Sequence, residues 1–90
     1  MNRRQRTSTD MANEILLHII YLESRMLISK KRYAGWRQIQ DEFADYKASL
    51  GPWPVAEVLD FLRTEYAPHC PFSREQIEIF LLSDDETIAA

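Results

Sequence analysis

Glycine, cysteine and histidine are scarce in this chain of 90 residues, and each scarcity removes a class of function. Two glycines leave no Gly-rich loop for phosphates and disfavour a turn-rich all-β fold. The single cysteine, Cys70, excludes an intramolecular disulfide framework. It fits a reducing compartment, so we expect a cytoplasmic protein, or a nuclear one in a eukaryote. The few His and Cys side chains cannot supply the four ligands of a structural zinc site, and we expect neither a metal nor a cofactor.

A long uninterrupted hydrophobic run is also missing. The most apolar segment spans residues 11–28, and polar residues interrupt it: Asn13, Glu14, His18, Glu23, Ser24 and Arg25. This segment is therefore not a membrane span, and no secretory hydrophobic region follows the N-terminus. The length of the chain indicates one small domain with a thin core, which association with a copy or a partner would stabilise.

The apolar residues of segment 11–28 recur at helical spacing. They form a wide stripe that consists of Ile15, Leu16, Ile19, Ile20, Leu22, Met26 and Leu27. Ser8, Thr9 and Asp10 offer side-chain oxygens for an N-cap. We predict a central helix that begins near residue 9 or 10 and around which the later segments pack. Part of its stripe is a candidate interface with a copy or a partner.

Three further elements are expected after this helix. A second helix is predicted over about 36–48, with Gly51 as a left-handed residue after its end. A third is predicted to begin at Pro54, which fits the first helical position, and to run to about Glu65. Ser73 and Gln76 resemble a capping box that opens a fourth element over 74–82. We favour a helix there, although its β-branched and aromatic content also fits a buried strand.

These elements predict an all-α fold: a small single-domain bundle of three to four helices around the N-terminal helix, its last element possibly a strand. The expected organisation is a flexible basic arm over 1–8, a helical domain over 9–83 and an acidic flexible tail over 84–90.

Charge is distributed unevenly along the chain. The first 37 residues carry eight Lys and Arg against three acids, whereas the remainder carries three against eleven. The basic part supplies candidate nucleic-acid contacts: Arg3, Arg4, Arg6, Lys30, Lys31, Arg32 and Arg37. Tyr33 and Trp36 lie among them, and cations beside aromatic rings suit phosphates and exposed bases.

The same layout permits a helix-turn-helix, with Leu50–Pro54 as the turn between the second and third helices. Its third helix would carry Glu57, Asp60 and Glu65 against one arginine, and such a helix repels phosphates. We therefore keep a helix-turn-helix-like DNA-binding regulator, using the basic arm and the Lys30–Arg37 segment, as the alternative function.

Catalytic chemistry is not indicated. His69 and Cys70 are adjacent in a Pro-flanked loop, where a nucleophile and its base rarely meet in hydrogen-bond geometry. We expect no catalytic residues and no enzyme. The favoured function is a small adaptor or inhibitor that binds another protein, or itself as a homodimer. The candidate interface residues are aromatic: Trp36, Tyr46, Trp53 and Tyr66.

Overall fold

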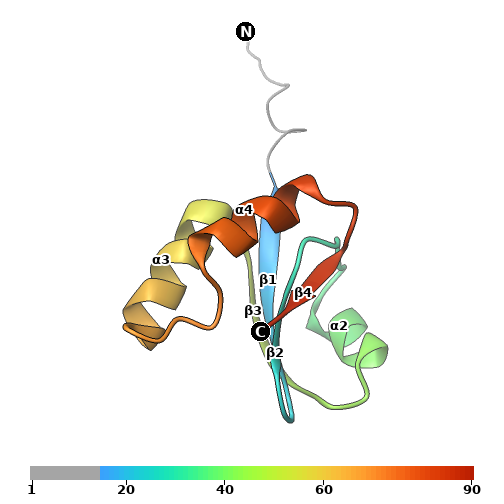
Figure 1. Ribbon diagram of the computed structural model, residues 1–90. Helices are drawn as coiled ribbons and strands as arrows, with labels where there is room; N and C mark the ends of the chain where they lie inside the picture. Colours follow the sequence, from blue (N-terminus) through green and yellow to red (C-terminus); the bar gives the residue numbers. More distant parts are fainter. Residues whose placement is uncertain (1–14) are drawn as a thin grey trace, which may run out of the picture.

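The computed structural model describes residues 15–90 and has a four-stranded antiparallel sheet at its centre (Figure 1). Its strands are β1 (Leu16–Leu22), β2 (Met26–Ser29), β3 (Tyr46–Pro54) and β4 (Thr87–Ala89), in the order β3-β1-β2-β4. Within the described residues the helices are α2 (Trp36–Glu42), α3 (Val55–Tyr66) and α4 (Arg74–Leu82). The prediction of an all-α bundle is therefore wrong, and the fold is of the α/β type.

The segment predicted as the central helix is instead a β-hairpin. β1 and β2 pair antiparallel, with Ile20 opposite Leu27 and Tyr21 opposite Met26. A short turn closes the hairpin, in which the amide of Leu22 donates to the carbonyl of Arg25 at 2.8 Å. Nearly every position of β1 is apolar because the strand is covered on both faces, and such a run also matches helical spacing.

Each face of β1 faces its own hydrophobic cluster. Leu17 and Ile19 pack with Ile28 of β2 against the buried residues of α3 and α4: Val58, Leu62, Ile77 and Phe80. On the opposite face, Ile20 and Leu22 pack with Leu27 and with Ile39 of α2. The sheet is therefore the middle layer, between α2 on one side and the α3–α4 pair on the other.

The second predicted helix is shorter than expected. α2 begins at Trp36 as predicted but ends at Glu42, and the chain then enters β3. The proposed helix-turn-helix is wrong for this reason, because its turn, Leu50–Pro54, is the second half of a strand that pairs with β1. Gly51 does have a positive φ of 110° as predicted, but it lies at a register shift of β3 and not at a helix end.

The last two helices match the sequence prediction closely. Pro54 precedes α3. The capping box before α4 is present: the Ser73 Oγ accepts from the Gln76 amide at 3.0 Å, and the Gln76 side chain accepts from the Ser73 amide at 2.8 Å. The element over 74–82 is thus a helix, and the strand alternative is wrong. Residues 87–89 of the expected tail form β4, where Ile88 lies opposite Ile28. The predicted basic arm lies outside the described residues.

Candidate functional site

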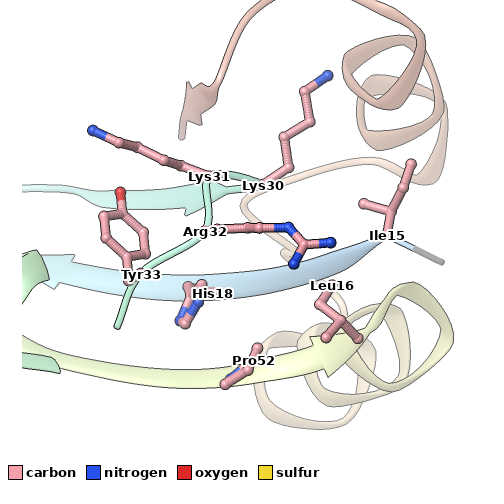
Figure 2. A pocket seen from close by; sticks show the side chains of 8 residues that line it. All are labelled: Ile15, Leu16, His18, Lys30, Lys31, Arg32, Tyr33 and Pro52. Carbon is pink, nitrogen blue, oxygen red and sulfur yellow. The ribbon is translucent and has the colours of Figure 1, made fainter. Parts of the chain in front are cut away.

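A cavity of about 410 Å³ lies on the α2 side of the sheet, where α2 itself does not cover β1. Strands β1 and β3 and the segment after β2 form its walls (Figure 2). Its lining residues are Ile15, Leu16, His18, Lys30, Lys31, Arg32, Tyr33 and Pro52. The cavity therefore combines aliphatic surface with one histidine, one tyrosine and several cations.

Hydrogen bonds fold the segment after β2 back over the sheet. Ser29 ends β2 opposite His18, and its Oγ accepts from the Lys31 amide at 3.1 Å. The same Oγ lies 3.1 Å from the Tyr33 hydroxyl. As a result the Tyr33 ring meets the His18 ring edge to face, with centroids 5.0 Å apart and planes at 82°.

His18 lines this cavity and is only 7% exposed. Burial lowers the pKa of its imidazole from the ordinary value of 6.5. His18 is therefore neutral at neutral pH and offers one ring nitrogen as a donor and the other as an acceptor. Burial is also the main reason why the pKa of the Tyr33 hydroxyl is raised, so that this group stays protonated.

The structure assigns different roles to the predicted nucleic-acid residues. The Nζ of Lys30 donates to the carbonyls of Phe80 and Ser83, both at 2.7 Å, and thereby joins β2 to the end of α4. The Nζ of Lys31 pairs with Glu42 at 2.8 Å, and this bond is the main reason why the pKa of Lys31 is raised.

The two described arginines of that set differ again. Arg32 is exposed, and its guanidinium extends along β1 towards Leu16 and Ile15 (Figure 2). Arg37 stacks on Trp36, 5.3 Å from the ring. Lys30, Lys31 and Arg32 all line the cavity, whereas Arg37 does not. Arg3, Arg4 and Arg6 lie outside the described residues.

The predicted interface aromatics are not gathered into one surface. Trp36 is 54% exposed, whereas the other three are partly buried. The Tyr46 hydroxyl lies 2.9 Å from the Ser49 Oγ, and Trp53 packs edge to face on Phe61 at 5.4 Å. The hydroxyls of Tyr66 and Tyr21 lie 3.1 Å apart. These contacts hold the rings of Tyr46, Trp53 and Tyr66 in the fold.

Sequence reasoning missed two exposed apolar residues on α4, Ile79 and Leu82. The signal was present, because a helix over 74–82 that turns Ile77 and Phe80 inward leaves Ile79 and Leu82 on its outer side. His18 was also missed, because the sequence reasoning treated it only as one of the polar residues that interrupt segment 11–28. Only a strand assignment puts His18 on the same face as Ile20.

No reactive pair forms within residues 15–90 at the positions that the sequence raised. The Sγ of Cys70 donates to the Leu62 carbonyl at 3.2 Å, whereas the neighbouring His69 donates its backbone amide to the Tyr66 carbonyl at 2.7 Å. Over the same residues, no group of three His, Cys, Asp or Glu is arranged to hold a metal ion. None of the helices in the described part of the chain is both long and apolar enough to cross a membrane.

The fold and the site together define an α/β protein with one antiparallel sheet, a basic cavity on one face and an exposed apolar helix surface on the other. Comparison with protein-family models, curated proteins and solved structures finds no match to this chain.

Proposed function

We propose that this protein is a non-enzymatic interaction module that binds another protein through the outer surface of α4. The observation that carries the proposal is the exposure of two large apolar side chains, Leu82 at 90% and Ile79 at 63%. They are three positions apart on α4 and therefore share one side of the helix. Adjoining exposed apolar side chains with a polar rim are typical of protein-binding surfaces.

A shallow cavity beside this pair gives the surface its shape. It measures about 200 Å³ and lies between α4 and β4, with lining residues Gln76, Ile79, Phe80, Ser83, Asp85 and Ile88. Its apolar walls come from both elements, so the cavity depends on the pairing of β4 with β2. One apolar side chain of a partner fits such a depression, and anchors of this kind dominate the energetics of interfaces.

The charges around the pair select the kind of partner. Glu75 and Glu78 lie one turn before Ile79 and Leu82 respectively, and Asp85 lines the cavity. The single cation of α4, Arg74, already pairs with Glu78 at 3.2 Å. The surface is therefore apolar with an acidic rim, and its complement is an amphipathic helix whose apolar residues are flanked by Lys and Arg.

The same charges argue against self-association through this surface. A two-fold dimer brings identical patches together, so the acids around Ile79 and Leu82 would face the same acids of the second copy. Like charges in such a position oppose binding. A different protein with a basic amphipathic segment is therefore the proposed partner, in preference to the homodimer.

A synthetic probe tests the proposal. The probe is an 18-residue helical peptide of Leu and Lys, with its leucines on one face, titrated into the protein by calorimetry. The double variant Ile79→Ser/Leu82→Ser is expected to bind it at least about tenfold more weakly, because two apolar anchors are lost. Trp36→Ser, which removes an exposed apolar side chain on the opposite side of the sheet, is expected to bind it like the wild type.

Either of two results contradicts the proposal. One is the absence of measurable peptide binding by the wild type at low salt. The other is equal affinity of the double variant and the wild type, which would place the peptide elsewhere. Both substituted side chains are exposed, so the double variant is expected to keep the wild-type unfolding midpoint.

A further inference from the structure

We propose that the cavity around His18 binds a small organic oxyanion, a phosphate or carboxylate group attached to a compact apolar body. Its volume of about 410 Å³ lies in the usual range for small-molecule sites, about 300–1,000 Å³. The cavity and the outer surface of α4 lie on opposite faces of the sheet. This inference is therefore independent of the proposed function.

Arg32 supplies the anion-binding end of the site. Its guanidinium offers a planar fork of N–H donors, which matches a carboxylate or phosphate with two parallel hydrogen bonds. Within residues 15–90 it forms no ion pair, and no acidic residue of this range lines the cavity. Glu42 and Glu86 act on the neighbouring Lys31. Lys31 lines the cavity too, and its Nζ is paired with Glu42.

Aliphatic side chains form the other end of the site. Leu16 and Ile15 are partly exposed at the cavity, and Pro52 of β3 lies across β1 from Arg32 (Figure 2). The guanidinium extends towards Leu16 and Ile15, so charged and apolar surfaces adjoin. A bare inorganic ion would leave this apolar surface wet, whereas an organic anion covers it and gains from its burial.

His18 adds a buried polar group to the wall of the site. It lies in the cavity wall on β1, where the Tyr33 ring packs edge to face against it. Because the imidazole is buried and neutral, it has one donor and one acceptor nitrogen. A small-molecule site usually combines a mostly apolar wall with a small number of polar groups in defined positions.

The positions of the other cations favour a small molecule over a nucleic-acid strand. A strand needs a row of available cations and exposed rings along its backbone. Lys30 is instead bonded to the end of α4, and Lys31 is paired with Glu42. Arg37 stacks on Trp36 and is not part of the cavity wall. The single arginine of the cavity suits one oxyanion.

Calorimetric titration with defined anions tests this inference. The probes are phenyl phosphate, benzoate, inorganic phosphate and a ten-residue oligothymidylate, each at low and moderate salt. At least one of the two aromatic anions is expected to bind with one-to-one stoichiometry and more tightly than inorganic phosphate. The tighter binder of the two shows whether the site prefers a phosphate or a carboxylate group.

Three variants locate the binding. Arg32→Gln is expected to weaken the aromatic anion at least about tenfold, since hydrogen bonds to a charged group are lost. Arg25→Gln removes the same charge from the tip of the hairpin and is expected to leave affinity unchanged. Leu16→Ser is expected to weaken the aromatic anions and to leave inorganic phosphate unaffected. All three side chains are exposed, so the variants are expected to fold.

Several outcomes would overturn the inference. Failure of both aromatic anions to bind the wild type would do so, as would equal affinity of Arg32→Gln and Arg25→Gln. Inorganic phosphate binding as tightly as its phenyl ester would indicate charge attraction alone. Binding of the oligothymidylate without either aromatic anion would assign the surface to a nucleic-acid strand instead.

Discussion

Lys30 connects the hairpin to the last helix, and its replacement by methionine gives a quantitative prediction. Its Nζ donates to the carbonyls of Phe80 and Ser83 at 2.7 Å each, and lies 4.6 Å from the Phe80 ring centroid. A cation in this position also favours the negative end of the α4 dipole. Methionine retains most of the apolar stem, so the substitution removes mainly the charge and its hydrogen bonds.

The expected loss is about 2 kcal/mol in the free energy of unfolding. Hydrogen bonds to charged groups are worth about 1.5–3 kcal/mol. The lower part of this range applies because the Phe80 carbonyl also accepts from the amide and the Oγ of Ser83 and is not left without a donor. With a urea m-value of about 1–3 kcal/mol/M, the unfolding midpoint should fall by about 1 M.

Urea unfolding followed by circular dichroism measures this shift. Lys47→Met is the matched control, because Lys47 is an exposed lysine on the edge strand β3. Its midpoint is expected to stay close to that of the wild type. Equal midpoints for Lys30→Met and Lys47→Met would refute the structural role of Lys30 and return it to the set of candidate ligand contacts.

Three further predictions concern single positions. Burial lowers the pKa of His18 below 6.5, so the unfolded state binds more protons below about pH 6.5 and stability falls as the pH drops. In urea unfolding at several pH values, His18→Gln should lose less stability towards acid than the wild type. An equal loss of stability in the two proteins would contradict this. A Cβ on Gly51, at φ 110°, would lie 2.6 Å from the carbonyl oxygen of Leu17, whereas a Cβ on Gly35 would meet open space. The melting temperature should therefore fall by several degrees for Gly51→Ala and hardly change for Gly35→Ala. Equal melting temperatures of the two variants would refute this prediction. Ser73→Ala removes the N-cap of α4 and should cost about 1 kcal/mol in urea unfolding; no loss would show that the cap is unimportant.

The parts of the fold that the sequence predicted depend on local signals. Pro54 before α3 and the Ser73–Gln76 capping box act within one helical turn, so they are readable without tertiary information. The hairpin lacked such a signal. Its turn, Glu23–Arg25, contains no Gly, Pro, Asn or Asp, and β1 is apolar on both faces. A continuous apolar run of this kind fits a helix and a doubly buried strand equally well.

The candidate site was predictable in its location but not in its roles. The Lys30–Arg37 segment was recognised as basic and aromatic, and three of its cations do line the cavity. What each cation does depends on partners that are remote in sequence. Lys30 meets Phe80 and Ser83, 50 and 53 positions away, and Lys31 meets Glu42. His18 joins the site only because β1 is a strand.

The cavity and the outer surface of α4 both depend on the hairpin, because it places His18 beside Ser29 and Tyr33 and leaves α4 to cover the opposite face. Proton–proton distances from nuclear Overhauser spectra of the full chain test it most directly. Cross-strand backbone contacts are expected between Ile20 and Leu27 and between Tyr21 and Met26. A ladder of contacts between residues three and four apart through Leu16–Leu27, typical of a helix, would contradict it.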